Sequence, residues 1–312
     1  MSNIPHLFRP YPQPVSGASP TRRQLCQSLL AGAVLLGPGM LPLRASAPGA
    51  LDLTREPDLL RALVKMRGSL DSELVIGWLR AKRFSISQGR IEPLCGLISA
   101  AFSRFRQVSD DLFEAVVLEI THYTDFETWE LLDTLVMPVT NREVEVPAFR
   151  FGPTTTRFAV SLDEREEFEP QEGTTQEAFS PAAAVRMTKS IHPEYVRDGT
   201  LLLRHEEHGR VRPTDSDIPN MFYKESTIWS APLDDVLDPK LTRVDALVNY
   251  SAMTSWRPWM HMGEVPGHTS SNGHGARARS IDDLPEDFLA HTRRLHPDVL
   301  EDPDAALGGF EE

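Results

Sequence analysis

Residues 112–123 read LFEAVVLEITHY, and their apolar side chains recur at every second position. In an extended chain, Val116 and Leu118 would point to one side, while Val117 and Glu119 would point to the other. A period of two is typical of a β-strand that lies half-buried in a sheet. This stretch therefore predicts a long strand with two different faces.

The segments on both sides of this strand continue the same alternation. Further strands are predicted at residues 74–87, 90–107, 129–139, 143–151, 185–191, 200–205, 221–230 and 244–256. The dipeptides Gln88-Gly89 and Asp198-Gly199 are typical of the tight turns that join neighbouring strands. Because the joining segments are too short for a helical crossover, neighbouring strands are expected to run antiparallel.

We expect a mostly β protein, either an antiparallel barrel or a strongly curled sheet of the calycin or lipocalin type. Closing such a sheet removes the exposed strand edges that would otherwise invite aggregation. One or two short helices accompany it, one within residues 51–66 and one at residues 284–295. A single domain is expected over residues 51–307, followed by a short tail at residues 308–312.

Three polar segments are expected to be loops. Residues 164–173 are acidic, and residues 206–209 would form the solvated tip of a hairpin. Residues 263–275 are rich in glycine and would form a mobile loop. The acidic segment is the best internal boundary, although the second half of the chain continues the same sheet.

The first 47 residues have the features of an export signal. Arg22 and Arg23 precede an apolar run at residues 25–36, and small residues follow at 45–47. The adjacent arginines resemble a twin-arginine signal, which directs folded proteins across the inner membrane. We therefore expect a periplasmic or secreted protein that meets the twin-arginine export machinery and keeps no stable membrane anchor after processing. The alternative is an N-terminal anchor helix, which the interruption at Pro38 disfavours.

The charge balance excludes one class of partner. The chain has 32 basic and 45 acidic residues, a net charge of −13, and its first 47 residues contain arginines but no acid. The remainder is therefore more acidic still, and a surface of this charge repels phosphate backbones. We expect no nucleic-acid partner.

The motifs of the common enzyme classes are missing. The sequence contains no glycine-rich phosphate loop, no GxSxG, no HExxH and no CxxC pair. Cys95 lies in an apolar setting and is expected to be a buried, unreactive thiol. His205 and His208 would point to opposite sides of a strand, so no metal site is predicted there. Whether a cofactor is loaded before export stays open.

His205 continues the face that carries Leu201 and Leu203, so it is expected to point into the core. An imidazole in that position needs hydrogen-bond partners. Two interpretations stay open: a structural histidine with satisfied partners, or a residue that transfers protons.

A second candidate group lies on the strand at residues 221–230. Tyr223, Glu225 and Trp229 share one face, and Lys224 lies on the other. A carboxylate between two aromatic side chains on a cavity wall would have a raised pKa and could act as a general base. The alternative is a structural ion pair between Glu225 and an arginine inside the barrel.

The segment Trp256-Arg257-Pro258-Trp259 forms the third candidate group. Two indole rings beside one fixed cation suit a flat apolar or aromatic ligand that carries a carboxylate, phenolate or carbonyl group. The alternative is an aromatic plug that closes one end of the barrel.

Five motifs, taken together and in order, resemble a secreted family known as domain of unknown function eighteen-thirty-eight. They are MRGSL at residues 66–70, PLCG at 93–96, VEVP at 144–147, FYKEST at 222–227 and SWRPWM at 255–260. The resemblance covers roughly residues 51–307 in one domain. It implies no activity, cofactor or catalytic residue.

These observations support three hypotheses for a barrel whose interior accepts a small apolar or aromatic molecule. In the first, the protein is a cofactor-free lyase or isomerase, in which Glu225 or His205 moves the proton and Tyr223 assists. The residues expected to bind the ligand are Trp256, Arg257, Trp259, Lys224 and Trp229. In the second hypothesis the barrel only carries its ligand, and in the third it is a structural barrel with a filled interior.

Overall fold

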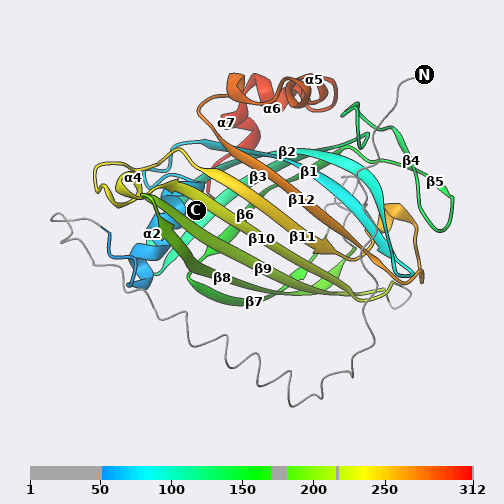
Figure 1. Ribbon diagram of the computed structural model, residues 1–312, viewed down its shortest axis with the longest axis horizontal. Helices are drawn as coiled ribbons and strands as arrows, with labels where there is room; N and C mark the ends of the chain where they lie inside the picture. Colours follow the sequence, from blue (N-terminus) through cyan, green and yellow to red (C-terminus); the bar gives the residue numbers. More distant parts are fainter. Residues whose placement is uncertain (1–50, 170–180, 216–217, 311–312) are drawn as a thin grey trace, which may run out of the picture. The chain divides into compact units, whose positions relative to one another are not determined.

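The computed structural model describes residues 51–169, 181–215 and 218–310 (Figure 1). The described residues all belong to one compact unit, residues 47–312. The predicted export signal, residues 1–47, lies outside the described residues.

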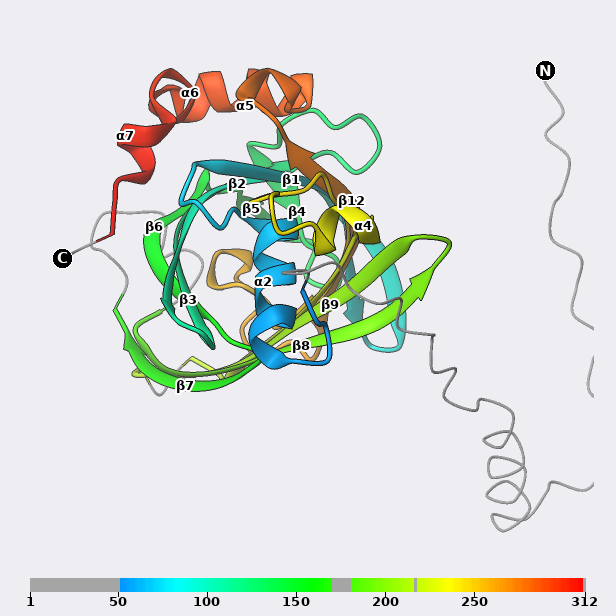
Figure 2. The same cartoon turned by 90° about the vertical axis from the view of Figure 1, so that its left-hand side faces the viewer.

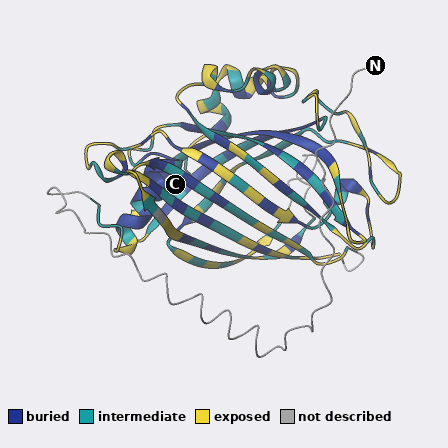
Figure 3. Ribbon diagram, viewed as in Figure 1, coloured by how far each residue is buried: buried dark blue, intermediate teal, exposed yellow. Residues whose placement is uncertain are grey.

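Ten strands form one antiparallel sheet that curls into a nearly closed barrel (Figures 1 and 2). In spatial order they are β6 (Phe149–Phe158), β3 (Leu112–Thr124), β2 (Arg90–Ser109), β1 (Val75–Ser87), β12 (His268–Ala278), β11 (Leu247–Thr254), β10 (Met221–Pro232), β9 (Thr200–Pro213), β8 (Ala183–Arg197) and β7 (Ser161–Phe168). Burial alternates along strands such as β1 and β9, as a two-faced sheet requires, whereas residues 94–100 of β2 are all buried (Figure 3). The expectation of an antiparallel barrel is confirmed.

The two edge strands, β6 and β7, follow each other in the chain, and side-chain and backbone contacts join the sheet across this seam. The Ile191 backbone N–H donates to the Val160 carbonyl at 2.9 Å. Lys189 on β8 donates from Nζ to Thr156 Oγ1 at 2.6 Å and to the Arg157 carbonyl at 3.0 Å. The seam is therefore narrow near the end of β6.

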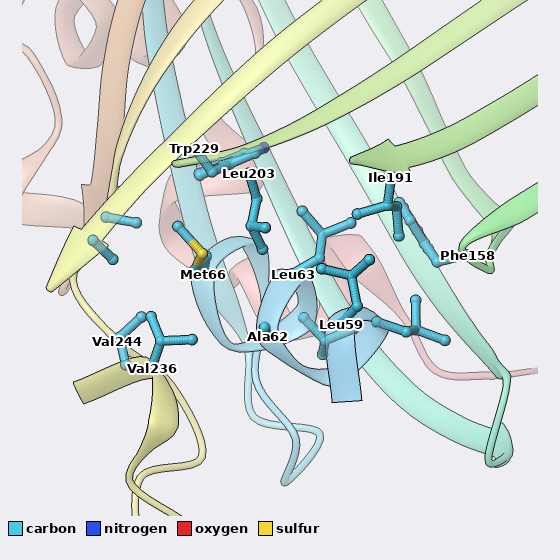
Figure 4. Close-up of a cluster of buried hydrophobic side chains, with 14 of the residues drawn as sticks. Leu59, Ala62, Leu63, Met66, Phe158, Ile191, Leu203, Trp229, Val236 and Val244 are labelled. Carbon is cyan, nitrogen blue, oxygen red and sulfur yellow. The ribbon is translucent and has the colours of Figure 1, made fainter. Parts of the chain in front are cut away.

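The helix α2 (Glu56–Arg67) lies inside one end of the barrel (Figure 2). Its apolar face, which includes the fully buried Ala62 and Leu63, packs against Phe158, Leu203 and Trp229 of the inner wall (Figure 4). Burial of this face removes apolar surface from water, so α2 closes that end by hydrophobic packing.

A buried lysine fixes the position of α2. Lys65 Nζ donates to the carbonyl oxygens of Val236 at 2.6 Å and Asp238 at 2.7 Å, at the C-terminal end of the short helix α4 (Leu233–Leu237). Carbonyl groups at a helix end lack partners within the helix, so the ammonium group satisfies them.

Three further helices, α5 (Glu286–Leu295), α6 (Pro297–Glu301) and α7 (Pro303–Leu307), cover part of the outer surface (Figures 1 and 2). Phe288 of α5 is fully buried against the outward face of β3, which carries Leu118 and Ile120. The expectation of one or two helices was too low, because five α-helices lie within the described residues. No helix in the described part of the chain combines the length and apolarity needed to cross a membrane.

Four predictions about individual segments were wrong. Of residues 129–139, only β4 (Thr134–Val136) is a strand, and it pairs with β5 (Glu143–Glu145) in a separate small sheet. Part of the predicted acidic loop belongs to β7, and the predicted hairpin tip at 206–209 lies within β9. Much of the predicted loop at 263–275 belongs to β12.

The last three of these segments share one physical property. A strand whose inner face lines a polar interior and whose outer face meets water has few apolar residues on either side. Its sequence then lacks the apolar–polar alternation by which a strand is recognised.

Candidate functional site

The strand register identifies the side chains that face the barrel interior. Leu203 and Trp229 contact α2 inside the barrel, so every second residue from them along β9 and β10 also faces inward. Pairing extends this assignment around the sheet. The inner wall of the middle section carries Arg83, Glu119, Tyr123, Lys189, His205, Glu207, Tyr223, Glu225 and Tyr250.

This middle section is partly open, unlike the end that α2 fills. Leu203 has no accessible surface, whereas the Glu207 side chain keeps 17% of its surface accessible. Tyr223, Glu225 and Tyr250 are also only half-buried. These side chains face the barrel interior and keep accessible surface. The interior between them is therefore not completely filled by other side chains. We call the space lined by Glu207, Tyr223, Glu225 and Tyr250 the central chamber.

Two carboxyl groups lie side by side on the wall of the central chamber. Glu225 of β10 and Glu207 of β9 are directly opposite in the antiparallel register. Residues in that relation have Cβ atoms roughly 4.5–5.5 Å apart. Tyr223 Oη donates a hydrogen bond to Glu225 Oε2 at 2.6 Å. The two glutamates therefore form an interacting pair.

Their surroundings drive the two pKa values apart. Burial and the neighbouring Glu207 raise the pKa of Glu225 from its ordinary value of 4.5 to about 7. Burial also acts to raise the pKa of Glu207, but His205, Arg67 and Lys189 outweigh it and hold that pKa below its ordinary value. Lys189 lies directly opposite Glu207 on β8. At neutral pH the pair therefore combines one permanent carboxylate with one carboxyl that exchanges its proton readily.

His205 lies between this pair of glutamates and the end of α2. Its ring is 2% exposed, and Arg67 Nη1, at the end of α2, lies 3.1 Å from Nδ1. A guanidinium can only donate, so Nδ1 accepts and the ring proton sits on Nε2, which lies 3.7 Å from Glu207 Oε1. Burial lowers the pKa of His205 to about 4. A neutral histidine held in one tautomer favours the structural interpretation, although Nε2 makes no hydrogen bond to the described residues.

The other end of the central chamber is cationic and aromatic. Arg83 of β1 donates from Nε to Ser271 Oγ at 2.9 Å and from Nη1 to Tyr123 Oη at 3.3 Å. Burial lowers the pKa of Arg257, and Arg83 adds to this lowering, while Tyr123 and, less strongly, Tyr223 and Tyr250 oppose it.

The structure brings together only part of the predicted ligand-binding set. Trp256 is half-buried and donates from Nε1 to the Val265 carbonyl at 3.0 Å. Trp259 is 5% exposed, and its ring meets Tyr123 edge-on at 5.2 Å, so it packs as part of an apolar cluster. Trp229 belongs to the α2 contact. Of the predicted ligand-binding residues on this side, only Arg257 and Trp256 are therefore not assigned to an apolar packing contact.

Lys224 does not belong with the other predicted residues. It lies on the outer face of β10, beside Arg204 and Glu206 in a shallow groove of the barrel surface. The alternation along β10 explains this position, since residue 224 must point away from Tyr223 and Glu225. The alternation predicted this opposite face, and the register agrees with it, while a part of Lys224 in ligand binding stays a prediction.

The sequence analysis missed several interior residues, among them Arg67, Arg83, Lys189, Glu207 and Tyr250. Glu207 continues the alternation of Leu203 and His205, but the segment had been interpreted as a hairpin tip. Arg83 continues the inward alternation of β1 in the same way. The alternation of side chains along each strand could therefore have predicted that both Glu207 and Arg83 face the interior.

Residues 73–308 match a sequence family described as "Protein of unknown function (DUF1838)". The chain belongs to this family. The match confirms the family that the five sequence motifs indicated, and it covers the whole barrel and the C-terminal helices.

Comparison with other proteins adds little to this family assignment. No curated protein matches the DUF1838 chain. The crystal structure of Neisserial surface protein A shares 8% identity at a TM-score of 0.29, over 66% of this chain and 96% of that one. The open-gate secretin InvG of the Salmonella SPI-1 type III secretion injectisome shares 12% identity at a TM-score of 0.17, over 77% and 65%. Neither likeness is strong enough to bear on the argument.

The described part of this DUF1838 chain holds no group of three or more histidine, cysteine or acidic side chains placed to bind a metal ion. Cys95 is fully buried, and burial raises the pKa of its thiol to about 11, as expected for an unreactive cysteine.

Proposed function

We propose that the central chamber binds a small apolar or aromatic molecule and that Glu225 moves a proton on it, as in a cofactor-free lyase or isomerase. One observation carries this proposal. Glu225 lies on a partly accessible inner wall, directly opposite Glu207 and hydrogen-bonded to Tyr223 at 2.6 Å. A carboxyl group with a pKa near 7 is suited to general acid–base chemistry at neutral pH.

Each residue has a distinct part in the proposed step. Glu225 accepts a proton from a carbon of the ligand, and the electron pair left behind either expels a leaving group or forms a new double bond. Return of the proton at another carbon completes an isomerisation. Tyr223 stays protonated, because burial and Glu225 raise its pKa well above the ordinary value, and it orients the Glu225 carboxyl.

The second candidate function is non-catalytic transport of the same kind of molecule. The closure of one end by α2 favours it, because a barrel closed at one end can retain a ligand without any chemistry. The accessible wall of the central chamber disfavours the third hypothesis, a structural barrel with a filled interior.

The catalytic proposal can be tested without knowledge of the natural substrate. The full-length protein is incubated in D2O with a panel of small aromatic ketones and aromatic keto acids, and deuterium uptake at carbon is followed by mass spectrometry. We expect exchange with at least one compound, at least about 100-fold slower in Glu225→Gln. Glu130→Gln, at an exposed position, serves as the control.

Two outcomes would overturn catalysis by Glu225. One is an exchange rate no higher than that of buffer for every compound, and the other is an equal rate in Glu225→Gln. If native mass spectrometry then finds a small molecule that co-purifies with the protein, the carrier function stands.

We also propose that the protein is exported through the twin-arginine route, on the evidence of residues 1–47 alone. The test is cell fractionation of the full chain with both Arg22 and Arg23 changed to lysine. We expect this variant to stay in the cytoplasm while Arg9→Lys reaches the periplasm. Equal export of the two variants would contradict the proposal.

A further inference from the structure

Arg83 is a buried cation whose protein partners are neutral. Its side chain is 6% exposed, and its hydrogen bonds go to the hydroxyl groups of Ser271 and Tyr123. Among the described residues, no carboxylate lies within ion-pair distance of it. Lys189, by contrast, lies directly opposite the carboxylate of Glu207. Burying a charge without a counter-charge is costly.

A second cation increases this cost. Burial and, after it, electrostatic repulsion by Arg83 lower the pKa of Arg257, against an opposing effect of Tyr123. Two neighbouring guanidinium groups attract an anion to the wall of a partly accessible interior. The two hydrogen bonds of Arg83 occupy two of its five N–H groups, so others remain for a ligand.

The wall between Arg83 and Glu225 is built from small residues. Register places Glu225, Ala252, Ser271 and Arg83 side by side in one row across β10, β11, β12 and β1. Three strand spacings separate the first from the last, roughly 14 Å along the wall. Ala252 and Ser271 are only 2% and 1% exposed, so neighbouring side chains cover this part of the wall.

We propose that Arg83, together with Arg257, binds the anionic group of an aromatic carboxylate or phenolate in the central chamber. The ligand would then lie between Arg83 and Glu225, with its far end toward Glu225, and would displace the side chains that cover Ala252 and Ser271. A guanidinium matches the two oxygens of a carboxylate in a bidentate arrangement. This inference rests on the proposed function, since it assigns the substrate class of the same site.

The experiment is a thermal-shift titration of the full-length protein with matched pairs of probes. The pairs are benzoate with benzamide, phenylacetate with phenylacetamide, and 4-hydroxycinnamate with its amide. We expect at least one carboxylate to raise the Tm in a concentration-dependent way and its amide to have at least a tenfold weaker effect. Arg83→Met should abolish that preference for the carboxylate.

Two further variants guard against a merely structural effect. Arg90→Met makes the same change at an exposed position near the β1–β2 turn, and it should leave the carboxylate preference intact. Arg83→Lys keeps the charge but not the bidentate geometry, so it should retain the preference at lower affinity. Circular dichroism of each variant verifies that it is folded. If Arg83→Met does not fold, Arg83→Lys decides, since unchanged carboxylate affinity in it contradicts the proposal.

The proposal is overturned if no carboxylate in the panel stabilises the protein, if the amides stabilise it equally, or if folded Arg83→Met keeps the preference. Glu225→Gln separates this result from the proposed catalysis. It removes no contact to the anionic group, so it should keep the carboxylate preference while losing exchange. Loss of exchange without any carboxylate preference would leave the catalytic role of Glu225 standing and remove only the Arg83 subsite.

Discussion

At the scale of single residues, the central feature is a pair of glutamates with different acidities. Glu207 faces cations on two sides, from Lys189 across the strand pair and from Arg67 at the end of α2. Glu225 lacks such partners and has a carboxylate as its cross-strand neighbour. Pairs of titratable groups whose surroundings separate their pKa values are a recurring basis of acid–base assignments in enzymes.

The raised pKa of Glu225 predicts a specific pH dependence of stability. Its pKa is about 7 in the folded state and 4.5 when unperturbed, so between these values the folded state binds a proton that the unfolded state does not. Stability contributed by the protonated carboxyl is complete below about pH 4.5 and is lost as the pH rises through 7. The full loss amounts to about 3 kcal/mol.

Glu225→Gln removes this loss. Relative to the natural chain, we expect the variant to be more stable at pH 8 and not more stable at pH 5, as measured by denaturant unfolding at both values. Glu130→Gln should show no such change between the two pH values. A constant difference between Glu225→Gln and the natural chain would contradict the raised pKa.

The interaction between the two glutamates gives a second prediction. The negative charge of Glu207 contributes to the raised pKa of Glu225, so Glu207→Gln should lower that pKa toward 4.5. Nuclear magnetic resonance of the Glu225 side-chain carboxyl carbon measures the titration directly. An unchanged midpoint in Glu207→Gln would show that the pair does not interact, while Glu130→Gln should leave the midpoint where it is.

At the scale of elements, β12 approaches β1 unusually closely at two glycines. A Cβ atom on Gly275 would lie 1.8 Å from the Trp78 carbonyl oxygen, and one on Gly273 would lie 2.1 Å from the Arg80 carbonyl oxygen. Both glycines therefore allow a backbone contact that any side chain would prevent.

Gly275→Ala should consequently destabilise the protein by at least about 2 kcal/mol, because backbone atoms of β1 must move to accept the methyl group. Gly77→Ala is the matched control on the same strand pair, with nothing within 4 Å of its added Cβ atom. It should be neutral or stabilising by up to about 1 kcal/mol. Denaturant unfolding of both variants measures the difference, and equal effects would disprove the close contact.

Some strands could be predicted from the sequence, and others could not. The strands β1 and β3 were predicted nearly to the residue, because each has one apolar face to reveal its period. The second half of β9 and most of β12 were missed, because their inner faces carry polar or very small residues. Glu225 and Tyr223 were placed correctly on one face, since β10 has aromatic residues at both ends of the polar stretch.

The rest of the site depends on contacts between distant segments. No local pattern could show that Arg67 of α2 reaches His205, or that Lys189 lies opposite Glu207. These pairings follow from strand order and from the entry of α2 into the barrel, which are properties of the assembled sheet.

At the scale of the whole molecule, a buried histidine couples the C-terminal helices to the barrel. His122 on the outward face of β3 is 1% exposed, and its Nε2 lies 2.8 Å from Thr292 Oγ1 of α5. Burial lowers its pKa to about 3, with further lowering by His291 and His296 and an opposing effect of Asp287. His122 is therefore neutral when the C-terminal helices are packed against the barrel.

Acid should weaken this docking. Between about pH 6.5 and 3 the unfolded chain binds a proton at His122 that the folded chain does not, so stability falls as the pH falls through this range. We expect His122→Leu to lose less stability between pH 6.5 and 4 than the natural chain, by denaturant unfolding. His192→Leu, at an exposed position, is the control. An equal loss in His122→Leu and the natural chain would contradict this account.

The pairing of β1 with β12 has a consequence for synthesis of the chain. Strands from opposite ends of the sequence are neighbours, since Ile76 pairs with Ala278. The ribosome must therefore make nearly all of the protein before the ring can form. A nascent chain that stops before residue 268 leaves both β1 and β11 with unsatisfied backbone groups. Prematurely terminated products are expected to associate through these strands and to require chaperones or proteolysis.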